Sequence, residues 1–146
     1  MANEVPYAFP VELLSGTHDF ATDTFKLALY TANPYTQSTS TVYVATSESS
    51  GTEYSAGGNT LAGNAVSNVA DIATVDFTDS VWGSPTPATF SAAYGALYNS
   101  SASNKLVVIL DFGGTKSCSN GTFTVTFPSP TSGSPTGADA LLSIQS

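Results

Sequence analysis

Apolar and polar residues alternate with a period of two along much of this chain, which restricts what it can fold into. In the segment 24–31, Phe25, Leu27 and Leu29 point to one side of an extended chain, and the residues between them point to the other. The segment 121–128 alternates apolar residues with threonines in the same way. Short alternating runs of this kind predict β-strands.

The segment 105–112, KLVVILDF, has a different pattern, because it is continuously apolar from Leu106 to Leu110. A short apolar run between the polar residues 99–104 and two glycines predicts a central strand covered on both faces. Asn120-Gly121 predicts a hairpin-type turn before the next strand. Ala140, Leu142 and Ile144 alternate near the C-terminus, and weaker strand patterns occur at 41–45, 59–66, 71–77 and 92–98.

Together these patterns predict an all-β fold, a single antiparallel β-sandwich or jelly-roll-like domain spanning residues 1–146. The segment 10–15 predicts one short N-terminal helical turn. Residues 1–11 are predicted to form an extended N-terminal arm. Residues 128–138 are predicted to form a long Pro/Ser/Gly loop, because prolines remove the donors that a sheet needs.

The charge of the chain excludes several partners. Three lysines, no arginine and eleven acidic residues give a net charge of −8. Nucleic acids and anionic membranes are bound by clustered cations, so we expect neither as a partner. The first residues lack the pattern of a secretory signal, so we expect a soluble protein made in the cytoplasm. The single cysteine, Cys118, cannot form an internal disulfide.

The sequence offers little catalytic or metal-binding chemistry. Its one histidine, His18, lies near Ser15 and Asp19, but no G-x-S-x-G motif accompanies them, so we interpret His18 as a turn residue. One histidine and one cysteine are too few for zinc, and the acidic segments 19–23 and 48–53 lack EF-hand spacing. We therefore expect no catalytic residue, no metal and no cofactor.

A carbohydrate-binding module is an alternative function. Trp82, Tyr94 and Tyr98 would form a stacking platform, with Asp76 or Asp79 accepting hydrogen bonds from sugar hydroxyls. This alternative requires exposed rings beside a carboxylate, whereas a structural sandwich would bury Trp82. The two carboxylates could also be read as a glycosidase pair, but a strand end followed by a polar turn is the simpler interpretation.

The segment 48–58, ESSGTEYSAGG, could be a ligand loop or a structural turn. Gly57 and Gly58 permit a turn with positive φ angles before a strand that begins near Asn59. We expect Tyr54 to lay its ring over the sheet edge with its hydroxyl in water. Glu48 and Glu53 should remain solvated, so the segment is interpreted as a structural turn.

Three segments in this order resemble a family of small structural proteins of tailed bacteriophages. They are ELLSGTHDFATDTFKLALYTA (12–32), ESSGTEYSAGGNTL (48–61) and YGALYNSSASNKLVVILDFGGTKSCSNGTFTVTFP (94–128). The family pattern reads "DTFK-ALYT", then "GTGYTAGG", then "GALIYN…LDFG" and "GTFTV-FP", and the resemblance covers about Glu12 to Ile144. Glu53 replaces a common glycine, which argues against a positive φ angle there. The family supplies no catalytic residues to carry over.

The resemblance implies a virion component, as a capsid decoration or cement protein on the head exterior or as a neck or tail component. The implied partners are the major capsid protein and copies of the chain itself, such as a trimer. From the residues alone, Val5, Tyr7, Phe9 and Val11 are interface candidates, because an apolar arm with two prolines needs a partner surface. That surface could equally be the core of its own domain.

Overall fold

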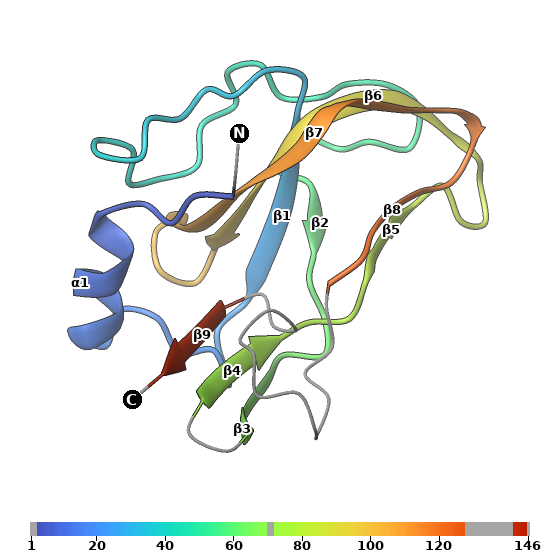
Figure 1. The fold of residues 1–146 in the computed structure, drawn as a ribbon. Coiled ribbons are helices and arrows are strands. Elements are labelled where there is room, and N and C mark those ends of the chain that lie inside the picture. The colour runs from blue at the N-terminus through green and yellow to red at the C-terminus, as the bar shows by residue number, and fades with distance from the viewer. Residues whose placement is uncertain (1–2, 70–71, 128–141, 146) are drawn as a thin grey trace.

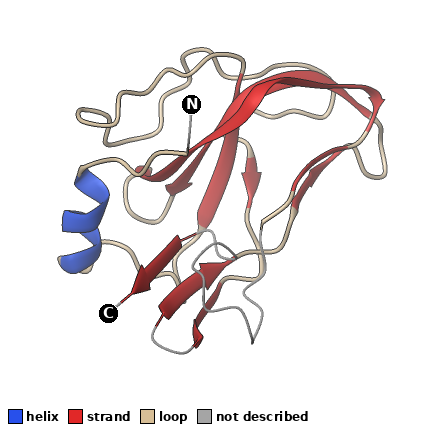
Figure 2. Ribbon diagram, in the orientation of Figure 1, coloured by secondary structure: helices blue, strands red, loops and turns tan. Residues whose placement is uncertain are grey.

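The computed structural model describes residues 3–69, 72–127 and 142–145. Strands dominate the described chain and one helix lies at its side (Figure 2). The predicted all-β, sandwich-like fold of antiparallel sheets with one short helix is confirmed. The elements are α1 (Ala8–Leu14), β1 (Phe25–Tyr30), β2 (Asn59–Thr60), β3 (Ala65–Val69), β4 (Ile72–Asp76), β5 (Ser80–Trp82), β6 (Ala88–Asn99), β7 (Lys105–Gly121), β8 (Phe123–Val125) and β9 (Leu142–Gln145).

The main sheet has four strands in the order β2-β1-β6-β7 (Figure 1). Strand β1 pairs with β6 in antiparallel register from Phe25 opposite Asn99 to Tyr30 opposite Tyr94. Two smaller sheets contain β3-β4-β9 and β5-β8. In Figure 1 the helix lies at the left of the molecule and the β3-β4-β9 sheet lies at the bottom.

The alternation predicted for β1 separates two hydrophobic cores. Phe25, Leu27 and Leu29 belong to the larger core, while Ala28 and Tyr30 belong to a smaller one with several other residues. Because successive side chains point to opposite faces of a strand, both faces of β1 are covered.

The apolar run 106–110 is buried along its whole length, as predicted, but β7 lies at the edge of its sheet and is not central. Isolated bridges cover this edge, one from Glu4 to Ile109 and one from Val42 to Lys105. The edge is therefore protected by two irregular segments in place of a strand, and the predicted strand at 41–45 is reduced to the second bridge.

The predicted hairpin turn at Asn120-Gly121 is wrong. Strand β7 continues through Gly121, and the next strand, β8, pairs with β5 and not with β7. Asn120 does adopt a positive φ of 51°. The pair therefore marks the point where the chain leaves β6 and joins a different sheet.

The predicted N-terminal arm is corrected, because helix α1 begins at Ala8 and takes up the last part of residues 1–11. The helix also begins two residues before the predicted turn at 10–15. Its Phe9 is buried in the core, whereas Tyr7 and Val11 are exposed. The predicted loop at 128–138 lies outside the described residues. Among the helices of the described chain, none is long and apolar enough to cross a membrane.

Candidate functional site

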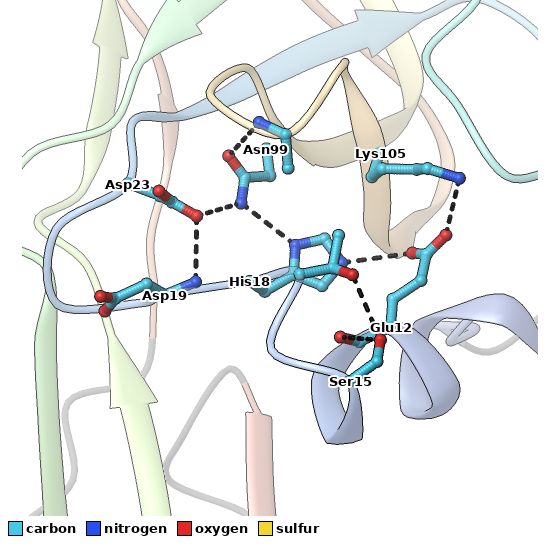
Figure 3. Close-up of polar contacts among 9 residues, drawn as sticks. Glu12, Ser15, His18, Asp19, Asp23, Asn99 and Lys105 are labelled. Carbon is cyan, nitrogen blue, oxygen red and sulfur yellow. Dashed lines mark hydrogen bonds and ion pairs between the residues drawn. The ribbon is translucent and has the colours of Figure 1, made fainter.

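His18 is the centre of a polar network beside α1 (Figure 3). Its Nε2 lies 3.2 Å from Oε2 of Glu12, and its Nδ1 lies 3.1 Å from Nδ2 of Asn99. The other Glu12 oxygen forms an ion pair with Nζ of Lys105 at 2.9 Å. Nδ2 of Asn99 also donates to Oδ2 of Asp23 at 2.6 Å. The network connects the helix, the loop before β1 and the hairpin of β6 and β7.

The hydrogen bonds of Asn99 decide which nitrogen of His18 carries the proton. Oδ1 of Asn99 accepts the backbone N–H groups of Ser101 and Ala102, so its amide nitrogen must face His18. An amide nitrogen only donates, so Nδ1 of His18 accepts and its Nε2–H donates to Glu12. Both ring nitrogens are engaged, which makes His18 a structural residue and not a free base or ligand.

The interpretation of His18 as a turn residue did not anticipate its burial. Its side chain is fully buried, and its ring packs 5.2 Å from Phe9 and 6.2 Å from Phe20, between centroids. Ser15 contacts Thr17 and the carbonyl of Glu12 instead of His18. The arrangement holds α1 against the core and does not form a Ser-His-Asp site.

Glu48 gives the segment 48–58 its shape. Its Oε1 accepts the hydroxyl of Tyr54 at 2.8 Å and the N–H of Gly57 at 2.6 Å, and its Oε2 accepts the hydroxyl of Tyr43 at 2.7 Å. The expectation that Glu48 stays solvated is therefore wrong. The Tyr54 hydroxyl also bonds to the backbone of Leu29, so it is not in water as predicted.

The turn itself forms as predicted. Gly57 and Gly58 have φ angles of 88° and 70° and lead into β2. Glu53 has a φ of 65°, so the argument against a positive φ at that position is wrong. The segment is a structural turn held by one carboxylate, and the exposed Glu53 is the carboxylate that remains in solvent.

Several tyrosines around Glu48 are held in their neutral form. Burial and the nearby Glu48 carboxylate raise the pKa of Tyr98 to about 12. Burial also raises the pKa values of Tyr43 and Tyr54, and the hydrogen bonds to Glu48 add to the effect because they stabilise the neutral hydroxyl. Burial raises the pKa of Tyr30, whose hydroxyl lies 2.6 Å from that of Tyr35.

The predicted sugar-binding platform is not assembled. Trp82 and Tyr98 are 2% and 3% exposed, and Tyr94 is half-buried. Trp82 packs in the large core against Phe90 and Phe123, and its Nε1 is buried without a hydrogen-bond partner among the described residues. An aromatic ring in this position cannot stack on a sugar.

The other carboxylates singled out in the sequence accept hydrogen bonds from the protein itself, from near or distant parts of the chain. Oδ1 of Asp76 accepts the N–H of Phe77, and Oδ1 of Asp79 accepts the N–H of Phe127. The hydroxyl of Thr22 and a backbone N–H lower the pKa of the Asp19 carboxyl. Within residues 3–69, 72–127 and 142–145, no group of three or more His, Cys, Asp or Glu residues is arranged to hold a metal.

The candidate functional site is an apolar face around α1. Among the described residues, seven large hydrophobic side chains are exposed, and five of them lie on α1, at its N-cap or on the cleft beside it. We call these five the apolar face: Tyr7 (64% exposed), Val11 (69%), Leu14 (90%), Val66 (57%) and Ile144 (61%). Exposed apolar residues that gather in one place mark interaction surfaces more often than scattered ones do.

An open cleft of about 750 Å³ lies between α1 and the β3-β4-β9 sheet. Phe9, Pro10 and Leu13 line it from the helix, while Val66, Val75, Leu142 and Ile144 line it from the sheet. Val5 and Phe9, two of the four predicted interface residues, face this cleft or the core, and Tyr7 and Val11 are exposed.

Sequence reasoning missed most of the apolar face. Leu14 fits the helical pattern but is its most exposed member, and Val66 and Ile144 come from strands far apart in the chain. The i, i+4, i+7 spacing of Tyr7, Val11 and Leu14 was the available sign of a common helix face. No protein-family model matches the chain, and searches of curated proteins and of solved structures give no match either.

Proposed function

We propose that the chain is a non-enzymatic structural protein of a tailed-phage virion, a capsid decoration or cement protein on the exterior of the head. It would be made in the cytoplasm of the bacterial host and would bind the major capsid protein and other copies of itself. The motif order of residues 12–32, 48–61 and 94–128 is the sequence basis of the proposal.

The observation that carries the proposal is the apolar face. A protein of this kind acts by burying apolar surface across subunit borders, and it needs exposed hydrophobic residues for that purpose. Tyr7 at the N-cap of α1, and Val11 and Leu14 on the helix, supply them. The opposite side of the helix is fixed to the core by Glu12 and His18. The burial of Trp82 supports this role over carbohydrate binding.

The charge of the chain is consistent with a position outside the shell. A net charge of −8 repels packaged DNA and keeps the free protein soluble before assembly. The apolar face would then provide the attraction to other subunits, and charge would provide solubility.

Immunogold electron microscopy of purified virions with an antibody against this chain tests the proposal. Label spread evenly over the head is the expected result, and loss of particle stability to heat after stripping the protein would add a cementing role. Label confined to the neck or tail would place the protein there instead. Intact particles without label would contradict an exposed virion protein, and a glycan-binding screen would follow.

A further inference from the structure

The buried ring of His18 connects the wall of the cleft to the helix and to the main sheet. Its Nε2–H donates to Glu12 on α1, and its Nδ1 accepts from Nδ2 of Asn99, the last residue of β6 (Figure 3). His18 itself belongs to the segment between α1 and β1, whose residues 16 and 18–21 line the cleft. The position of this wall therefore depends on the protonation state that the two bonds require.

Asn99 presents an N–H group to His18 whatever the protonation state of the ring. A rotated amide would withdraw Oδ1 from the N–H groups of Ser101 and Ala102, which it accepts at 3.0 and 3.1 Å. It would also turn Nδ2 away from Oδ2 of Asp23, to which it donates at 2.6 Å. Rotation would thus lose three hydrogen bonds and gain one, so the amide keeps its orientation.

A proton on Nδ1 of His18 would place two donors face to face. In the neutral ring, one hydrogen of Asn99 lies between two nitrogens 3.1 Å apart, whereas in the imidazolium both nitrogens carry hydrogen. The side chain is fully buried beside Phe9 and Phe20, so water does not hydrate the charge in this position. The charged ring and Asn99 are therefore incompatible at their present separation.

Glu12 and Lys105 are the charged groups on the Nε2 side of the ring. The Glu12 carboxylate attracts a positive charge on the imidazole, and Nζ of Lys105, on β7, offsets part of this attraction from 2.9 Å. The bond from Nε2 to Glu12 keeps its donor and its acceptor when the ring is charged. Protonation therefore leaves His18 joined to the helix, and the contact that is lost is the one with Asn99.

The other charged groups near His18 are Asp19 and Asp23, in the loop before β1. The hydroxyl of Thr22 and the N–H of Ala21 lower the pKa of Asp19, which remains a carboxylate while a histidine titrates. Asp23 lies on the far side of the Asn99 amide nitrogen, so the ring must move to reach its carboxylate (Figure 3). Among the described residues, the sheet that lines the cleft contributes no charged side chain to this lining.

We propose that the contact between His18 and Asn99 is a pH-sensitive switch in the wall of the cleft. When Nδ1 takes up a proton from water, His18 moves away from Asn99 together with the neighbouring residues of the segment 17–22. Return of the proton to water restores the contact and the shape of the cleft. The inference goes beyond the proposed function, because it concerns the isolated chain and holds whatever that chain assembles with.

Nuclear magnetic resonance of the full chain labelled with ¹⁵N tests the switch. His18 is the one histidine of the chain, so its ring gives a single set of nitrogen signals. We expect the tautomer with hydrogen on Nε2 at about pH 8, and a titration to about pH 5 covers the range in which histidine takes up a proton. As the ring protonates, the side-chain amide of Asn99 should exchange its hydrogens with water at least about tenfold faster.

Asn59 supplies an internal control in the same spectra. Its side-chain amide donates to the hydroxyl of Ser80 and the carbonyl of Val81, away from His18. Amide hydrogens ordinarily exchange more slowly as the pH falls over this range. The Asn59 side chain should therefore slow on acidification while that of Asn99 becomes faster, and a general loosening of the fold would accelerate both.

His18→Phe is the matched variant, because it keeps an aromatic ring beside Phe9 and Phe20 but has no nitrogen to protonate. In this variant, acidification should no longer accelerate exchange at Asn99. Circular dichroism verifies that the variant is folded, and His18→Gln, which is also neutral over this range, replaces it if it is not.

Four results would overturn the inference. The ring could protonate while the Asn99 side chain continues to exchange slowly, or it could remain neutral down to about pH 5. His18→Phe could show the same acceleration as the wild type, which would place the acid-sensitive group elsewhere. A neutral ring with its hydrogen on Nδ1 at about pH 8 would contradict the arrangement of donors on which the switch depends.

Discussion

The Nε2–H of His18 donates to Oε2 of Glu12 at 3.2 Å, and this bond joins the helix that carries the apolar face to the body of the protein. His18 has no access to water that could replace Glu12, because its side chain is fully buried. This bond, the Glu12–Lys105 ion pair and the buried Phe9 together fix the position of the helix, and with it the orientation of its exposed side chains.

Removing this acceptor should destabilise the fold. Glu12→Ala leaves the Nε2–H of His18 buried without a partner, which costs about 1–3 kcal/mol of unfolding free energy. Glu12→Gln keeps an acceptor oxygen and should lose less. Urea denaturation of both variants measures the difference, and Glu53→Ala serves as the control because Glu53 is exposed. Equal stability of Glu12→Ala and the control would contradict this role.

Glu48 should be the more critical of the two carboxylates in the segment 48–58. Glu48→Ala removes the acceptor of the Tyr43 hydroxyl and of the Gly57 N–H, and leaves the Tyr54 hydroxyl only the longer contact to the carbonyl of Leu29, so we expect a loss of about 3 kcal/mol. Glu53→Ala in the same segment should change stability by less than about 0.5 kcal/mol. Thermal unfolding of the pair checks the prediction, which fails if the two variants melt together.

The strands were predictable where a local pattern determined them. Alternation located β1, and the continuous apolar run located the buried part of β7. The edge position of β7 was not predictable, because Glu4 and Val42 cover it through isolated bridges only, and the weak strand pattern at 41–45 does not reveal which strand it lies beside. Asn120-Gly121 likewise did not form the predicted hairpin turn, because strand β7 continues through Gly121 and pairs there with β6.

The polar sites were harder to predict because only the folded chain brings their partners together. Glu48 looked like a solvated carboxylate, and its tyrosine partners lie within six residues of it, yet only the folded turn brings the three together. His18 lies 81 residues from Asn99, whose amide decides the histidine tautomer. Charge and composition predicted an acidic chain, but they gave no information on which carboxylates would accept hydrogen bonds within the fold.

Two glycines with nearly equal φ angles allow two costs of an alanine substitution to be compared: the strain of a positive φ angle and the collision of the new Cβ with neighbouring atoms. Gly58 and Gly113 have φ angles of 70° and 69°. A Cβ at Gly58 would collide with the backbone of Leu27 and Ala28, whereas a Cβ at Gly113 meets no atom of the described chain within 4 Å. Gly113→Ala should therefore cost about 1 kcal/mol from the φ angle alone.

Gly58→Ala adds the collision with β1 to the same strain, so the loss should reach at least about 3 kcal/mol. Urea denaturation of the two alanine variants measures both values under identical conditions. Similar losses for both would mean that the turn before β2 can move away from β1, and the close approach of Gly58 to Leu27 would not be needed for stability.

The tyrosines around Glu48 should make the fold sensitive to alkali. Their folded pKa values lie above the value of about 10 for an unfolded tyrosine, so their contribution to stability is complete below pH 10. It is lost as the pH rises from about 10 toward the folded values, about 12 for Tyr98, because the unfolded chain loses protons first. The unfolding free energy should therefore fall steadily over this range.

Urea denaturation at a series of pH values measures this decline, and the ultraviolet absorbance of tyrosinate measures ionisation in the same samples. Tyr98→Phe removes one of the shifted groups and should make the decline less steep, although it also loses the hydrogen bond to the carbonyl of Gly57. We expect tyrosinate absorbance from the buried rings to rise together with unfolding. Full ionisation of the tyrosines near pH 10 in a chain that remains folded would show that Glu48 and burial do not hold them neutral.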